Sequence, residues 1–212
     1  MHSRREISRS LSGLLCLLLV VAAACKDAKR GGSQENGGSP AQSELRSRYS
    51  FEAHLSRGDH AFDVFTEGSG SLRMMTILHT EGAFADTVRK KIDGAVINAE
   101  CGDLDRDSIP EIYVFAQTAG SGSYANLFGF QFDQRGRQSI ALPELDKRQS
   151  AGYLGHDTLW VQDSILIRMF PVFTEGDLNV SASGGTRTLE YGLQRDPHGN
   201  LYLRASRVIN KQ

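Results

Sequence analysis

The chain has 212 residues, of which 40% are hydrophobic, with 22 glycines, five prolines and a formal net charge of −1 at pH 7. This near-neutral balance, without a basic patch, argues against nucleic acid as a partner. About 160 residues follow the polar N-terminal region, enough for a single domain with its own hydrophobic core.

Residues 1–24 have the pattern of a secretory signal peptide. Three arginines precede the uncharged run LLCLLLVVAAA, which is shorter than the ~20 residues that span a bilayer. The three alanines before Cys25 resemble a bacterial lipobox, and this resemblance implies cleavage before Cys25 and lipidation of that cysteine. The alternative is an ordinary signal cleavage nearby, which would leave Cys25 unmodified.

Residues 25–48 are rich in Gly, Ser and charged side chains, which is typical of a flexible linker. We therefore expect one domain, residues 49–212, tethered to a membrane through the lipid on Cys25. Such a protein would belong to the cell envelope, on the outer membrane and facing the periplasm or the surface. Cys101 is then the only other cysteine of the mature chain, so no internal disulfide is expected, and we interpret it as a small buried hydrophobe.

The folded part alternates apolar and polar residues with a period of two. Residues 164–170 (SILIRMF), 186–193 (TRTLEYGL) and 201–209 (LYLRASRVI) follow this pattern, the last one slipping out of phase near its end. Residues 72–79, 111–117 and 128–132 are further apolar or aromatic runs, and Gly-rich turn signals separate the runs. This arrangement predicts an all-β protein, an antiparallel sandwich or barrel of about eight or more short strands.

Ser121, Gly122, Ser123 and Tyr124 form a Gly/Ser-rich connection between two of these strands. GSGSYA fits the loose dinucleotide pattern G-x-G-x-x-A, but that motif needs a following helix, and NLFGFQF predicts a strand. Tyrosine on such a loop is typical of interface hot spots, although the same composition suits a mobile loop with the ring folded back onto the sheet. Without a catalytic constellation, we expect a protein that is not an enzyme.

Asp103, Asp105 and Asp107 recur at every second position, and Glu111 follows four residues later. Clustered carboxylates on a tight loop are typical of calcium sites. However, Ser108 stands where a glycine usually permits the sharp turn. The sequence favours a polar turn capped by Asp side chains, with no cofactor, and leaves calcium binding as the alternative.

The stretches GDLDRDSIPEIYVFAQTAGSGSYANLFGF and FPVFTEGDLNVSASGGTRTLEYGL resemble the bacterial inhibitors of invertebrate-type (I-type) lysozyme. That family has a D-L-x-x-D-G-x-P-E stretch before an apolar strand, an S-G-x-Y loop after it, and a later G-G-T-R-x-x-x-Y hairpin. The resemblance covers residues 95–193. It departs from the family at residues 106–108, where a glycine-containing turn is expected.

The resemblance implies a β-sandwich or barrel that inserts its S-G-x-Y loop into the lysozyme cleft and so protects peptidoglycan. The lysozyme-binding residues would be Ser121, Gly122, Ser123 and Tyr124, with Thr186 and Arg187 on the second hairpin. Arg187 would pair with a carboxylate of the cleft, or is simply a strand arginine. Two rival functions remain: a calcium-binding or adhesive envelope domain, and a lipoprotein that uses the same loop on a different envelope partner. The sequence leaves the oligomeric state open, a dimer included.

Overall fold

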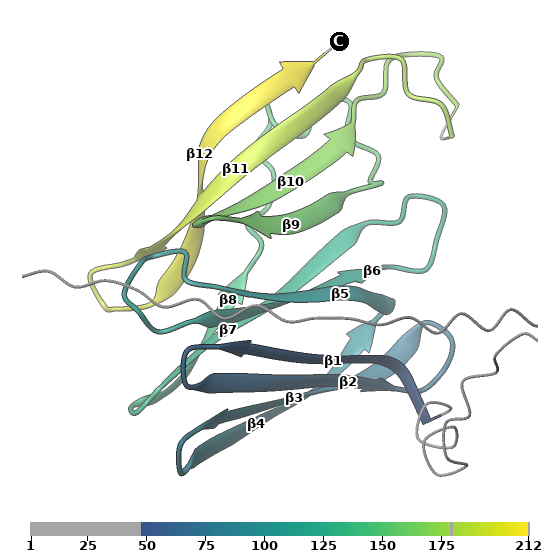
Figure 1. The fold of residues 1–212 in the computed structure, drawn as a ribbon. Coiled ribbons are helices and arrows are strands. Elements are labelled where there is room, and N and C mark those ends of the chain that lie inside the picture. Colours follow the sequence, from purple (N-terminus) through teal and green to yellow (C-terminus); the bar gives the residue numbers. More distant parts are fainter. Residues whose placement is uncertain (1–47, 179, 212) are drawn as a thin grey trace, which may run out of the picture. The chain divides into compact units, whose positions relative to one another are not determined.

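The computed structural model describes residues 48–178 and 180–211, and within them twelve antiparallel β-strands form three four-stranded sheets (Figure 1). The predicted signal peptide, Cys25 and all of the linker but residue 48 lie outside the described residues. In the described part of the chain, no helix is long and apolar enough to cross a membrane. The prediction of an all-β antiparallel fold is confirmed.

Each sheet is built from four consecutive strands. The first sheet has the order β1-β2-β3-β4 and the second has the order β5-β6-β7-β8. The third sheet has the order β12-β11-β10-β9. The strands are β1 Tyr49–Arg57, β2 His60–Glu67, β3 Leu72–Glu81, β4 Phe84–Asp93, β5 Ala95–Gly102, β6 Glu111–Gln117, β7 Ala125–Asp133, β8 Gly136–Ala141, β9 Thr158–Gln162, β10 Ile165–Pro171, β11 Thr186–Arg195 and β12 Leu201–Lys211.

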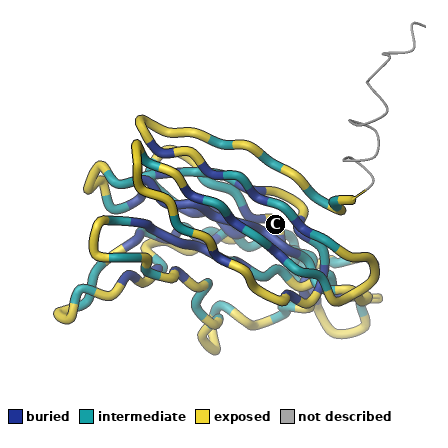
Figure 2. Tube along the Cα trace, turned by 90° about the horizontal axis from the view of Figure 1, so that it is seen from below, coloured by how far each residue is buried: buried dark blue, intermediate teal, exposed yellow. Residues whose placement is uncertain are grey.

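The second sheet lies between the other two, so the fold has one layer more than a two-sheet sandwich (Figure 1). One hydrophobic cluster fills the space between the first and second sheets, and another fills the space between the second and third. Figure 2 shows the buried positions concentrated along the strands and the exposed ones at the turns. The central sheet therefore buries both of its faces.

Strand β6 shows why the central sheet can do this. Its residues alternate between the two clusters: Ile112, Val114 and Ala116 pack toward the first sheet. Tyr113 and Phe115 pack toward the third. A strand buried on both faces has to be apolar at nearly every position, which explains the continuous run IYVFA.

The phase slip in the last strand corresponds to a β-bulge. Glu190 pairs with Arg207 but Tyr191 pairs with Ala205, so Ser206 is an extra residue in β12. A bulge of this kind moves the following side chains to the opposite face.

Residues 143–150, between β8 and β9, make one hydrogen-bonded turn, in which Ser150 N–H donates to Asp146 O at 2.8 Å.

Candidate functional site

The β6–β7 loop is held by hydrogen bonds across its own base. Thr118 N–H donates to Tyr124 O at 3.0 Å, and Tyr124 N–H donates to Thr118 Oγ1 at 3.2 Å. Ser123 N–H donates to Gly120 O at 3.2 Å, and Ser123 takes a left-handed φ of 41°. These bonds define one conformation for the tip, residues 120–123, and leave the strand β7 to begin at Ala125.

Tyr124 is the exposed aromatic residue of this loop, with 45% of its surface accessible. Its ring lies over Gly122, where an added Cβ would overlap the ring. Its edge meets Tyr153, with ring centroids 5.7 Å apart and an interplanar angle of 70°. Tyr124 thus presents one side to solvent while the other is supported, as a rigid interface side chain requires.

Residues 149–157 pack against the β6–β7 loop, a contact that the sequence did not predict. We call residues 149–157 the supporting segment. His156 N–H donates to Gly122 O at 2.6 Å. Gly155 approaches so closely that a Cβ there would overlap the Gly122 carbonyl, and its φ of 92° also favours glycine. The tip of the β6–β7 loop is therefore fixed from below as well as across its base.

A buried ion pair anchors this supporting segment to the third sheet. Arg168 Nε donates to Asp157 Oδ1 at 2.6 Å, and both side chains are at least nine-tenths buried. Tyr153 O–H donates to Asp157 Oδ2 at 2.6 Å and accepts from Arg168 Nη2 at 2.7 Å. Asp157 Oδ2 also accepts from Ala125 N–H at 3.2 Å, which ties the start of β7 to the same carboxylate.

Burial raises the pKa of Tyr153, and its hydrogen bond to Asp157 raises it further, so the phenol stays protonated at neutral pH. Tyr153 therefore carries the proton that it donates to the carboxylate. We call Tyr153, Asp157 and Arg168 the anchor network.

Arg187 and Thr186 lie at the start of β11, next to the same segment. Arg187 Nη1 donates to Gln149 O at 2.6 Å and to Ala151 O at 2.7 Å. Its Nε donates to Asn210 Oδ1 at 2.8 Å. Its guanidinium lies 6.0 Å from the Phe170 ring centroid, and Phe170 in turn meets the ring of Tyr153 at 4.7 Å. Through these contacts Arg187 holds the start of the supporting segment in place.

The two stretches that carry the sequence resemblance thus meet on one part of the surface. We define the loop face as residues 118–124, 149–157 and 186–187. Of the predicted lysozyme-binding residues, Ser121 and Tyr124 are exposed on it, Ser123 is half-buried and Gly122 is buried. Thr186 and Arg187 are half-buried, and Arg187 contacts residues 149–151 and the ring of Phe170.

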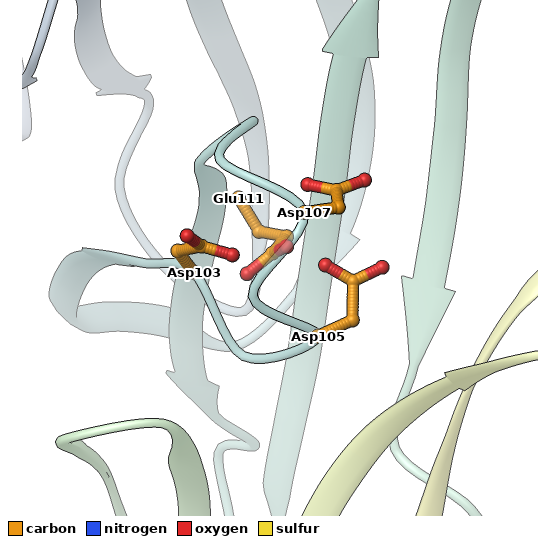
Figure 3. A group of neighbouring side chains, drawn as sticks. All are labelled: Asp103, Asp105, Asp107 and Glu111. Atoms are coloured by element: carbon orange, nitrogen blue, oxygen red, sulfur yellow. The ribbon is translucent and has the colours of Figure 1, made fainter.

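The carboxylates that the sequence singled out form a separate cluster at the other end of β6. Asp103, Asp105, Asp107 and Glu111 surround the connection that leads into β6, with one ligand atom from each within 4.8 Å of the others (Figure 3). Burial raises the pKa of Glu111 to about 8, and burial and the neighbouring Asp107 raise the pKa of Asp105. Ser108, where a glycine was expected, takes the left-handed φ of 72° itself.

Cys101 lies on β5 at the edge of the first cluster, where its thiol contacts Ser56 O at 3.7 Å and burial raises its pKa. A thiol with a raised pKa is a poor nucleophile. Cys101 packs against the cluster as a small hydrophobic residue, but it is half-buried and not fully buried as expected.

Sequence reasoning missed the anchor network. One signal for it was present: Arg168 shares a strand face with Leu166 and Phe170, and a charged residue between two apolar ones on a core face requires a buried partner. Asp157 and Tyr153 had no such signal, because their role depends on contacts between sheets.

Comparison of the chain with protein-family models, with curated proteins and with solved structures gives no match.

Proposed function

We propose that the protein is a lysozyme inhibitor that inserts the loop carrying Ser121 to Tyr124 into the substrate cleft of the enzyme. The observation that carries this proposal is the exposed Tyr124 on a loop whose conformation is already fixed by the segment beneath it. The resemblance of the two stretches that meet on the loop face to inhibitors of I-type lysozyme supports the same function and names the target class.

The chemistry of the loop suits such a cleft. Glycosidases of this type carry two carboxyl groups, one protonated and one ionised. The hydroxyls of Ser121, Ser123 and Tyr124 can donate to a carboxylate or accept from a carboxylic acid. Because the loop is already ordered, binding loses little conformational entropy, so more of the contact energy appears as affinity.

Arg187 acts within this proposal as a positioning residue. Its two hydrogen bonds to backbone carbonyls hold residues 149–151, which belong to the segment under Tyr124. A variant that loses the guanidinium, Arg187→Met, would weaken inhibition because residues 149–151 would no longer be held in place.

The proposal includes a lipid anchor on Cys25. This anchor would place the inhibitor in the envelope, where lysozyme attacks peptidoglycan.

The test is an inhibition titration of I-type lysozyme with the purified full chain in mild detergent. Tyr124→Ala is expected to cost about 2 kcal/mol or more, which is a rise of about 30-fold in the inhibition constant. Tyr202→Ala is the matched control: Tyr202 is 40% exposed and lies near the opposite end of the third sheet, where it bonds to Gln194. An equal inhibition constant for Tyr124→Ala and wild type would remove the loop from the mechanism.

A further inference from the structure

The acidic cluster before β6 lies apart from the loop face. Asp103, Asp105 and Asp107 come from the β5–β6 connection, and Glu111 is the first residue of β6. The proposed inhibitory loop follows the last residue of the same strand. Seven residues at ~3.3 Å each separate the two places by about 20 Å. The cluster therefore needs an explanation of its own.

Two of its carboxylate oxygens are buried without a hydrogen-bond partner among the described residues: Asp103 Oδ1 and Asp105 Oδ1. The side chain of Asp105 is 10% exposed, so nine-tenths of it is out of contact with water. A buried anionic oxygen that accepts no hydrogen bond loses its hydration without compensation, which is strongly unfavourable. These oxygens indicate that a cationic ligand belongs beside them.

The contacts within the cluster are made by other oxygens. Glu111 Oε2 accepts from Leu104 N–H at 2.9 Å and from Tyr113 O–H at 3.1 Å. Asp107 accepts from Gln131 Nε2 at 3.2 Å through both of its oxygens. These bonds hold Glu111 and Asp107 in place beside Asp103 and Asp105, whose Oδ1 atoms accept no hydrogen bond among the described residues (Figure 3).

Arg195 is the basic side chain that ion-pairs with the cluster in the described part of the chain. Its Nη2 lies 2.6 Å from Asp107 Oδ2 and 3.3 Å from Asp105 Oδ2. It therefore contacts the second oxygen of Asp105 and leaves Oδ1 without a partner. One guanidinium offsets one negative charge, whereas the cluster has four carboxyl groups.

We propose that Asp103, Asp105, Asp107 and Glu111 bind one calcium ion, with Arg195 as the outer partner of the two middle aspartates. Calcium takes six to eight oxygen ligands at about 2.3–2.6 Å, so ligands on opposite sides of the ion are about 4.8 Å apart. The four ligand atoms here lie within 4.8 Å of one another, which matches this span. Magnesium prefers shorter bonds and retains several waters, and a cage of four carboxylates suits it less well.

Calcium would join the connection between β5 and β6 to the start of β6, at one end of the central sheet. Because it binds the folded state and not the unfolded chain, the ion would raise the melting temperature progressively as its concentration exceeds the dissociation constant. The inference does not depend on lysozyme inhibition, since the two regions lie at opposite ends of β6.

The experiment uses the full chain in mild detergent, treated with EDTA and dialysed. Calcium chloride and magnesium chloride are titrated separately by calorimetry, and the melting temperature is measured with and without each ion. We expect one calcium per chain with a dissociation constant of about 1 mM or below, a higher melting temperature in calcium, and binding of magnesium at least tenfold weaker. No binding of calcium, or equal binding of magnesium, would overturn the proposal.

Asp105→Asn tests the site with the smallest change in shape, and Asp93→Asn is its control, since Asp93 is an exposed carboxylate at the end of β4. Asp105→Asn is expected to weaken calcium binding at least tenfold, whereas Asp93→Asn leaves it unchanged. Circular dichroism checks that both variants fold. Equal loss in both variants would mean that calcium binds the surface through net charge alone, against the proposal.

Terbium emission provides a readout that does not depend on a variant. Tyr113 O–H lies 3.1 Å from Glu111 Oε2, so a terbium ion in the calcium site would be next to a phenol that sensitises its emission. We expect emission on excitation of tyrosine, and we expect calcium to displace it. Terbium emission that calcium does not reduce would count against a calcium site at this loop.

Discussion

Replacement of Arg168 by methionine tests how much the anchor network stabilises the folded protein. Methionine keeps most of the apolar volume but removes the hydrogen bonds from Nε to Asp157 and from Nη2 to Tyr153. Asp157, which is 2% exposed, then remains as a buried carboxylate without its cation. Breaking a buried pair in this way costs about 3–5 kcal/mol, which corresponds to a fall of about 6–20 °C in melting temperature for a domain of this size.

Urea unfolding followed by circular dichroism measures this loss as a free energy of unfolding. Arg204→Met is the control, because Arg204 is exposed on β12 and its loss should cost less than about 0.5 kcal/mol. The double variant Arg168→Met/Asp157→Asn removes the uncompensated charge and should regain at least about 1 kcal/mol. A loss below about 1 kcal/mol in Arg168→Met would refute the reasoning, since Asp157 would then be solvated or protonated without difficulty.

Two other perturbations follow from the described contacts. Gly155→Ala places a Cβ against the Gly122 carbonyl at a φ of 92°, so we expect weaker inhibition in the titration above. Gly82→Ala is the control: Gly82 has a φ of 55° and open space around it, so its replacement should leave inhibition unchanged. His79 is buried against Phe132, and desolvation, followed by the charge of His60, lowers its pKa below 6.5, although Glu81 and Asp86 act in the opposite direction. The unfolded chain therefore binds more protons than the folded one just below pH 6.5, and the free energy of unfolding falls as the pH decreases through that value. In urea titrations between pH 7.5 and 5, roughly the range over which an ordinary histidine titrates, His79→Phe should show a smaller decline than wild type, and an identical decline would contradict this assignment.

Local patterns in the sequence were sufficient to predict the all-β class and six of the twelve strands by position. The period of two in residues 164–170 and 186–193 corresponds to β10 and β11, and the phase slip near residue 206 corresponds to the bulge in β12. The short runs of residues 111–117 and 128–132 correspond to β6 and to the second half of β7. Alternation within one strand is a local property, so a single sequence can carry it.

The three-layer arrangement and the support of Tyr124 were not predictable in the same way. Burial of β6 on both faces depends on two other sheets, and the contact of Tyr153 with Tyr124 joins residues 29 positions apart. The absence of a glycine at position 108 counted against calcium binding when the sequence alone was considered. Ser108 takes the left-handed conformation all the same, since the surrounding structure can impose a backbone that the residue alone disfavours.

The central claim is that the loop face blocks a lysozyme cleft, and titration of the wild-type full chain into I-type, chicken-type and goose-type lysozymes tests it most directly. Lysis of a cell-wall suspension is the readout. We predict stoichiometric loss of I-type activity, with the other two classes inhibited less strongly or unaffected. Full activity of all three enzymes in the presence of the folded protein would contradict the claim.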